Sequence, residues 1–189
     1  MRKTALFTVI LLLLACLSLV PAQDAELDQP KPPNLAPYYP TPAAVVKSML
    51  ELGELRPGEL LYDLGSGDGR IVIMAAQSFG ARAVGFEIDR RLVYQSRKRI
   101  EKRKLTHLAS IEEQDLMTAD LSKPDLVTVY LLPGSNDKIQ PLLAEQMKPG
   151  SRIVSHDFTF KEWTPDKEIT VEDPSDEEIP IHKLYLYRR

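Results

Sequence analysis

The chain has 189 residues, of which 43% are hydrophobic and 27% are charged, values typical of one globular domain with a sizeable core. Its 24 basic and 27 acidic residues give a formal net charge of −3, which provides no reason to expect a nucleic acid partner. A single cysteine excludes a disulfide framework.

The first 22 residues have the organisation of a secretory signal peptide. Arg2 and Lys3 precede an uncharged stretch, and Val20-Pro21-Ala22 supplies the small residues expected before a cleavage site. Two alternatives stay open, because residues 13–16 (LLAC) loosely resemble a bacterial lipoprotein box and an uncleaved helix would be a membrane anchor. We therefore expect the domain to be exported, periplasmic or extracellular, or anchored facing outward, with membrane contact through this segment alone.

Residues 23–37 are proline-rich and predict an extended linker that becomes ordered near Tyr38. Residues 38–189 are expected to form the folded domain. Thr41 and Pro42 have the types found at the N-cap and first position of a helix, which we expect to end at Gly53.

Short apolar runs then alternate with amphipathic segments. Strands are predicted at residues 60–64, 83–87, 108–111, 126–132 and 152–156, and helices at residues 70–79, 90–104 and 136–147. This alternation predicts an α/β fold in which helices cover both faces of a parallel sheet. Two more strands, at residues 168–171 and 183–187, have no helix between them, so we expect them to form an antiparallel pair at one sheet edge.

The loop after the first predicted strand, in ELLYDLGSGDGR (residues 59–70), has three glycines at alternate positions. In a parallel α/β sheet this loop opens a ligand crevice, and glycines let its backbone approach the ligand. Glu87 ends the second predicted strand about twenty residues later, where an acid can accept hydrogen bonds from both ribose hydroxyls of a nucleoside cofactor. Asp115 follows the third predicted strand, where it could meet an adenine amine.

Charges around the glycines favour S-adenosylmethionine over NAD as this cofactor. A dinucleotide fingerprint would have a further glycine at position 70, where this chain has Arg70. Asp63 and Asp68 flank the glycines, and carboxylates suit the sulfonium and amino groups of S-adenosylmethionine better than a pyrophosphate. An NAD-dependent oxidoreductase is therefore disfavoured.

Several motifs together resemble those of a known family. YDLGSGDGR and GFEID resemble motif I and the acidic second-strand tip of class I S-adenosylmethionine-dependent methyltransferases, and TPAAVVKSMLEL, VTVYLLP, MKPG and IVSHDF extend the resemblance over residues 38–189. More narrowly, the chain is similar to the protein-lysine methyltransferases that act on the c subunit of ATP synthase and on adenine nucleotide translocase, and to their bacterial homologues.

This resemblance implies a Rossmann-like seven-stranded sheet with an antiparallel C-terminal edge pair, S-adenosylmethionine as cofactor, and N-methylation of lysine on a protein substrate. It places Glu87 at the ribose, Asp115 and Leu116 at the adenine, and Thr41 in an N-terminal element that closes over the cofactor. The residues that it places around the methionine part are Asp63, Gly65, Ser66, Gly67 and Gly69.

Methyl transfer is an in-line displacement at an activated carbon, so positioning of the nucleophile can supply much of the catalysis. Tyr130 is a candidate for orienting an amine, with a buried central-strand position as the alternative. His156 and Asp157 are candidates for proton handling, with a polar strand end as the alternative. Three histidines without a second ligand at a recognisable spacing lead us to expect no metal.

A second hypothesis is a noncatalytic exported module that keeps the nucleoside-binding crevice. It is motivated by a conflict between predicted export and a cofactor that is made in the cytosol. The sequence leaves open the methyl acceptor, the degree of methylation and the oligomeric state.

Overall fold

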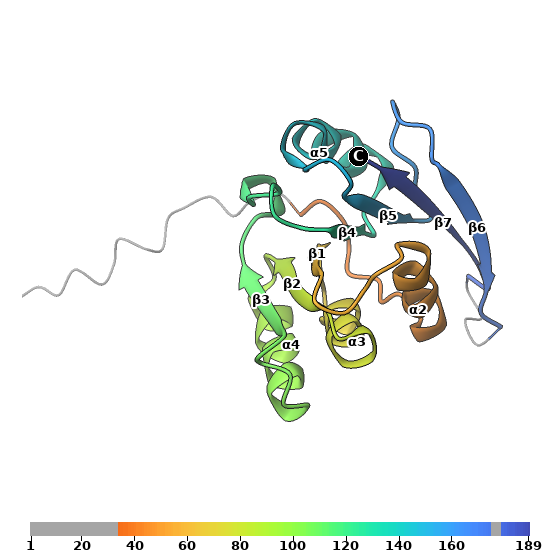
Figure 1. The fold of residues 1–189 in the computed structure, drawn as a ribbon. Coiled ribbons are helices and arrows are strands. Elements are labelled where there is room, and N and C mark those ends of the chain that lie inside the picture. Colours follow the sequence, from red (N-terminus) through yellow and green to blue (C-terminus); the bar gives the residue numbers. More distant parts are fainter. Residues whose placement is uncertain (1–33, 175–178) are drawn as a thin grey trace, which may run out of the picture. The chain divides into compact units, whose positions relative to one another are not determined.

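In a computed structural model, residues 34–174 and 179–189 are described, and they contain one sheet of seven strands in the order β3-β2-β1-β4-β5-β7-β6 (Figure 1). The strands are β1 (Leu60–Leu64), β2 (Arg82–Glu87), β3 (Ala109–Glu113), β4 (Leu126–Val129), β5 (Arg152–His156), β6 (Lys167–Glu172) and β7 (Ile181–Arg188). Strands β1 to β5 run parallel, and β7 is antiparallel to both β5 and β6. The predicted Rossmann-like sheet with an antiparallel edge pair is confirmed.

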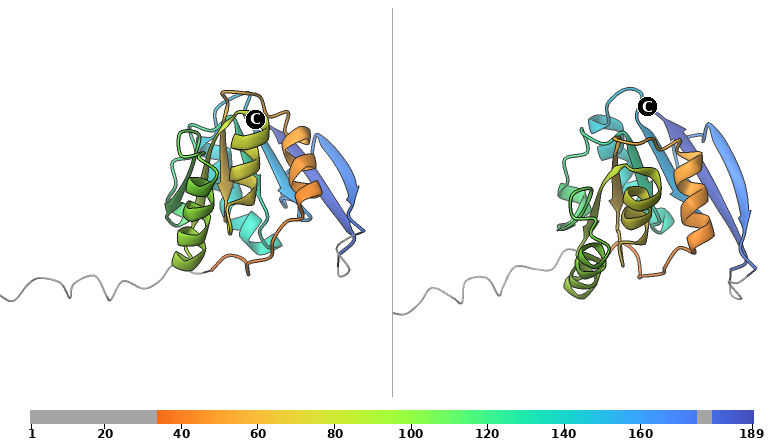
Figure 2. Two further views of the ribbon diagram at one scale, coloured as in Figure 1. Left: turned by 90° about the horizontal axis from the view of Figure 1, so that it is seen from below. Right: turned by 60° about the horizontal axis from the view of Figure 1, so that its bottom comes forward.

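Helices cover both faces of this sheet (Figure 2). They are α2 (Ala43–Leu52), α3 (Arg70–Phe79), α4 (Arg90–Lys102) and α5 (Pro133–Gln146), with a 3₁₀ turn at η1 (Leu116–Thr118). The first three pack on one face and α5 packs on the other, so each face has its own buried cluster. Within the described ranges, no helix is long and apolar enough to cross a membrane.

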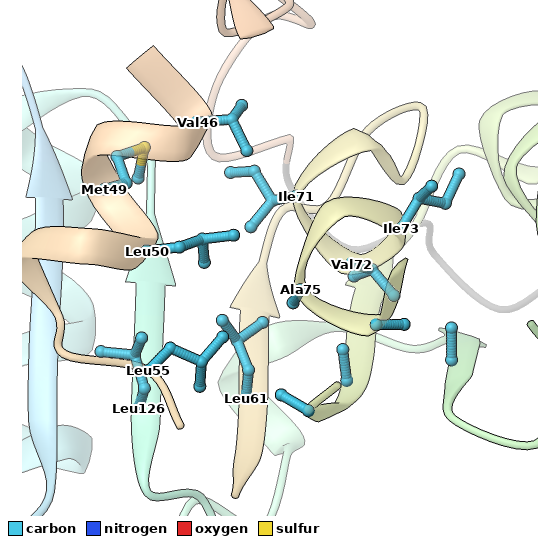
Figure 3. Close-up of a cluster of buried hydrophobic side chains, with 14 of the residues drawn as sticks. Val46, Met49, Leu50, Leu55, Leu61, Ile71, Val72, Ile73, Ala75 and Leu126 are labelled. Carbon is cyan, nitrogen blue, oxygen red and sulfur yellow. The ribbon is translucent and has the colours of Figure 1, made fainter. Parts of the chain in front are cut away.

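The cluster beneath α2 and α3 fixes the strands that carry the glycine loop. Val46 and Leu50 of α2 point toward Ile71 of α3 (Figure 3), and all three side chains are buried. Full burial of an aliphatic side chain of this size contributes about 1.5–3 kcal/mol. This packing holds the carboxyl end of β1 and the first turn of α3 in one rigid arrangement.

The fourth predicted strand is shorter than expected. Strand β4 ends at Val129, and α5 begins at Pro133 instead of residue 136. Proline is favoured in the first helical turn because it lacks an N–H that would go unpaired there. The residues between them, 130–132, are therefore released from the sheet.

The N-terminus of α2 also differs from the prediction. Its N-cap is Pro42, with no side-chain capping hydrogen bond, and not Thr41. Thr41 is buried and its hydroxyl lies 3.3 Å from Nδ1 of His156.

The predicted signal peptide or anchor, and residues 23–33 of the predicted linker, lie outside the described residues. Residues 34–37 belong with the domain, because Leu35 and Ala36 pack against the core and Ser135 Oγ donates a hydrogen bond to the Leu35 carbonyl. Residues 34–37, which we predicted as the end of the linker, therefore contact the domain.

Candidate active site

A cavity of about 170 Å³, open to solvent, lies at the carboxyl ends of the parallel strands. This is the edge at which parallel α/β sheets bind ligands. Its walls come from the loops that follow β1, β2, β3 and β4, and from residues 34–41, here called the N-terminal strap. The predicted cofactor-binding residues that line it are Thr41, Asp63, Gly65, Ser66, Gly67, Glu87, Asp115 and Leu116.

Gly69 is the exception, and the prediction that it surrounds the cofactor is not supported by its position. It does not line the cavity, and a Cβ there would lie 2.9 Å from Cβ of Ser96 in α4. Its φ of 76° is also in the left-handed region that favours glycine. The absence of a side chain at Gly69 serves the packing of α4 against the loop.

Gly67 does face the cavity, and it does so beneath the strap. Its φ is +53°, and a Cβ there would lie 2.8 Å from Cε2 of Tyr38. The ring of Tyr38 therefore rests directly on the glycine loop. Burial and the Asp68 charge raise the pKa of Tyr38.

Glu87 braces the glycine loop from the tip of β2. One carboxylate oxygen accepts the N–H of Gly67 at 2.8 Å, and the other accepts the N–H groups of Ile88 and Asp89, each at 2.8 Å. Hydrogen bonds to a charged acceptor are stronger than neutral ones. Glu87 also lines the cavity. The hydrogen bonds that stabilise the loop therefore also fix the position of a carboxylate that a ligand can contact.

Asp63 is buried at the end of β1, where Thr128 donates a hydrogen bond to its carboxyl at 2.8 Å. Burial raises the pKa of Asp63 to about 7, and the charges of Glu87 and Asp68 act in the same direction. A carboxyl so placed is stabilised in its charged form by any cation that enters the cavity.

Asp68 behaves differently from Asp63. Burial alone would raise its pKa, but the guanidinium groups of Arg70 and Arg99 hold the pKa well below its usual range. Asp68 is thus already neutralised by the protein. The sequence predicts that Asp63 and Asp68 supply the negative charge for a cationic cofactor. In the structure, Asp63 and Glu87 supply this charge instead.

Arg70 explains the departure from a dinucleotide fingerprint in structural terms. Besides its two contacts with Asp68, at 2.9 and 2.8 Å, it donates to the Thr41 carbonyl at 2.7 Å. The arginine thus ties the strap to the first turn of α3.

Asp115 and Leu116, which the resemblance places at the adenine, both line the cavity. The Asp115 carboxylate accepts the Met117 N–H at 2.9 Å and caps η1, while Leu116 is buried.

These residues fit S-adenosylmethionine. Ser66 lines the cavity, while its hydroxyl, which has no hydrogen-bond partner among the described groups, is buried against the backbone of Gly85, where a side chain would collide with it. The carboxyls of Asp63 and Glu87 give the cavity a negative character that suits a sulfonium and an ammonium group.

The three catalytic candidates lie side by side, but only Tyr130 lines the cavity. Its hydroxyl donates to Oδ2 of Asp157 at 3.2 Å, and its ring lies 3.8 Å from the ring of His156, centroid to centroid. His156 is fully buried behind it. Burial lowers the pKa of His156 to about 4.

His182 was not predicted from the sequence. It is fully buried in β7, and its Nδ1 lies 3.0 Å from Nε2 of His156. The sequence of β7 has no local signal that places His182 inward, since its neighbour Ile181 is apolar yet exposed, and the pairing of His182 with His156 depends on the β5–β7 register.

Comparisons with known proteins identify the family. A family described as the ANTKMT methyltransferase domain matches residues 63–167. A protein-lysine N-methyltransferase of Saccharolobus islandicus is 41% identical over 152 residues, which are 80% of this chain and 92% of the relative. A lysine N-methyltransferase of Xenopus laevis, named for the C subunit of ATP synthase, is 33% identical over 130 residues, or 69% of this chain and 57% of that protein.

A solved structure extends the comparison to the fold. It is described as an RNA methyltransferase from Salinibacter ruber in complex with S-adenosyl-L-homocysteine, has 45% sequence identity and a TM-score of 0.72, and the match covers 79% of this chain and 93% of that one. The noncatalytic hypothesis finds no support among these relatives. The chain therefore belongs to the ANTKMT methyltransferase-domain family and is an S-adenosylmethionine-dependent methyltransferase.

Proposed function

We propose that this enzyme transfers a methyl group to the ε-amino group of lysine on a protein substrate. The observation that carries the proposal is the 41% identity to a protein-lysine N-methyltransferase across 92% of that relative's length. The partner would thus be a protein whose lysine side chain can reach the cavity beside Tyr130.

The bound cofactor would supply a methyl carbon already activated by its sulfonium. The residues of this chain then have to hold the cofactor and orient the accepting amine. Glu87 would hold the ribose, and Asp63 would lie by the methionine part with the loop residues Ser66 and Gly67. The strap would cover the cofactor, because its residues line one wall of the cavity and Arg70 fixes the carbonyl of Thr41. Exclusion of water strengthens each of these polar contacts.

The acceptor end would be organised by Tyr130. Its O–H donates to Asp157, so the phenolic oxygen is oriented to accept a hydrogen bond from a neutral amine. The backbone carbonyl of Leu131, a residue that lines the cavity, is a further acceptor for such an amine, whereas the Leu132 carbonyl already accepts the N–H groups of Ser135 and Asn136. His156 is too deeply buried to touch the acceptor, since its two ring nitrogens face Thr41 and His182.

A second acceptor class is RNA, which is favoured by the 45% identity to the Salinibacter ruber protein described as an RNA methyltransferase. The electrostatics of this chain favour protein. The most basic element, α4, has several of its arginines engaged within the domain: Arg90 pairs with Glu113, Arg97 donates to the Ile111 carbonyl, and Arg99 pairs with Asp68. These cations are partly compensated, which weakens the case for a phosphate-binding surface.

The test uses the full-length protein with S-adenosylmethionine carrying a labelled methyl group, offered in parallel to a lysine-rich protein extract and to total RNA. We expect label in protein, recovered as methyl-lysine after acid hydrolysis. The Tyr130→Phe variant, with cofactor binding checked by calorimetry, should lose transfer and keep affinity for S-adenosylhomocysteine. Label in RNA alone, or in a different amino acid, would overturn the lysine proposal.

Export is a separate proposal, supported by the charge and apolar pattern of residues 1–22. Cell fractionation of the full-length protein, with mass spectrometry of its N-terminus, distinguishes a cleaved, a lipidated and an anchored form. Quantitative recovery of the intact chain in the cytosol would contradict the proposal.

A further inference from the structure

We propose that His156, Asp157 and His182 form a binding site for one divalent transition-metal ion of the zinc class. His156 ends β5, Asp157 follows it, and His182 lies in the adjacent strand β7. One ligand atom from each residue lies within 4.8 Å of the others. The site lies behind the cavity wall, where Asp157 accepts the hydrogen bond of Tyr130, but none of the three ligands is itself a proposed contact of the cofactor or the lysine, and zinc binding can be measured without methyl transfer.

The separations between the ligand atoms match those around a metal ion. Nε2 of His156 is 3.0 Å from Nδ1 of His182 and 3.4 Å from Oδ2 of Asp157, and the third side of the triangle is 3.6 Å. An ion bound at about 2.1 Å holds neighbouring ligands about 3.0 Å apart at right angles and about 3.4 Å apart in a tetrahedron. An ion therefore fits here with only small shifts of the side chains.

Two of the three ligands, His156 and Asp157, are oriented by groups behind them, as in known metal sites. Nδ1 of His156 lies 3.3 Å from the Thr41 hydroxyl, an arrangement in which Nε2 can face the ion. The Asp157 carboxylate accepts the Lys183 N–H through Oδ1 at 2.9 Å, which leaves Oδ2 toward the histidines. Asp157 also has a φ of +57°, and such left-handed backbone in a residue other than glycine is often retained at functional sites.

Burial of His182 points to the same conclusion. Its side chain is fully buried, and its Nε2 has no hydrogen-bond partner among the described groups. An unpartnered polar atom destabilises a core, and an aliphatic side chain would fill this position without that cost. The imidazole instead presents its other nitrogen, Nδ1, to His156 and Asp157, and a ligand role for Nδ1 is the reason that we infer for keeping a histidine at this position.

The donor set selects the class of ion. Two imidazole nitrogens and one carboxylate oxygen suit Zn²⁺ and its first-row neighbours, whereas Mg²⁺ and Ca²⁺ favour oxygen ligands. The Asp157 side chain is 18% exposed, which leaves an access path and room for water as a further ligand. The Tyr130 hydroxyl, bonded to the same Oδ2, links the site to the cavity wall.

The experiment titrates the full-length protein, purified with a tag that lacks histidine and stripped with a chelator, with Zn²⁺ alone in a competition assay. We expect one ion per chain, and a rise in Tm of about 5–10 °C when free zinc is 100-fold above Kd. Co²⁺ substituted for Zn²⁺ should give visible absorption bands of a low-symmetry nitrogen and oxygen site.

The variants assign the ion to these ligands. His182→Gln and Asp157→Asn should each lower zinc affinity at least about 100-fold, while His107→Gln, at the third and exposed histidine, and Cys16→Ser should bind like the wild type. Absence of one-to-one binding, or equal binding by His182→Gln, would overturn the site and leave a hydrogen-bonded histidine pair. Should His182→Gln fail to fold, Asp157→Asn and the wild-type Co²⁺ spectrum decide, and a spectrum without bands rejects the proposal.

Discussion

Replacement of Glu87 by glutamine tests the placement of the cofactor's ribose. The side chain keeps its shape but loses its charge and one acceptor oxygen. In the structure that carboxylate accepts three backbone N–H groups, one on Oε2 and two on Oε1. A glutamine cannot satisfy both sets, because one of its two terminal atoms is a donor.

Two effects of similar size follow. Loss of a charged hydrogen bond to the ribose should cost about 1.5–3 kcal/mol of binding free energy, which is about a 10- to 150-fold rise in Kd. Loss of a charged hydrogen bond within the half-buried glycine loop should lower the free energy of unfolding by about 1–2 kcal/mol, or Tm by about 2–8 °C.

Calorimetric titration with S-adenosylhomocysteine measures the first effect without turnover, and urea denaturation measures the second. Glu113→Gln is the matched control. Glu113 pairs in register with Glu87 on β3, lies outside the cavity lining, and makes a surface ion pair with Arg90 that should be worth under about 1 kcal/mol. A folded Glu87→Gln protein with unchanged affinity, or an equal loss in the control, would refute the reasoning.

Three further predictions concern pH, the strap and the sheet. Because the folded-state pKa of Asp63 is raised to about 7, a cationic cofactor has to bind the ionised carboxylate, so Kd for S-adenosylmethionine should tighten by up to about tenfold per pH unit as pH rises toward 7. The free folded protein favours the protonated carboxyl, so its stability should fall as pH rises from about 4 to 7. Asp63→Asn should flatten both profiles, and a wild-type Kd that is constant with pH would contradict the assignment. Gly67→Ala should lose about 1–2 kcal/mol of stability and also weaken S-adenosylhomocysteine binding, since its Cβ displaces the strap. Gly58→Ala is the control, because it has the same left-handed strain but no atom within 4 Å of the added Cβ, so it should lose stability without a change in cofactor affinity. Equal affinity of the two variants for S-adenosylhomocysteine would argue against a strap that covers the cofactor. Arg152→Met breaks a contact of 2.6 Å with Glu59 and two bonds to backbone carbonyls, so urea denaturation should show a loss of about 3 kcal/mol without a change in cofactor affinity; a loss under about 1 kcal/mol would show that the pair is screened by solvent.

Local patterns were sufficient for much of the fold. The bounds of β1, α3 and β5 were predicted correctly from short apolar runs and a helical period, because those signals lie within single elements. The two helix-less strands at the C-terminus likewise required an antiparallel pair, since a parallel connection needs a crossover. Element ends were less secure, as in β4, where Pro133 began a helix directly after the predicted strand region.

The sequence by itself also determined the cofactor cavity, because its main parts lie close together along the chain. A glycine loop and an acid about twenty residues later identify a nucleoside site through one strand-helix-strand unit. Contacts at long separation were decided by the tertiary structure alone. Arg99 neutralises Asp68 from 31 residues away, and Thr41 meets His156 across 115. His182 reaches His156 only because β7 pairs beside β5 in one register, and no local period encodes that pairing, which depends on how the whole sheet packs.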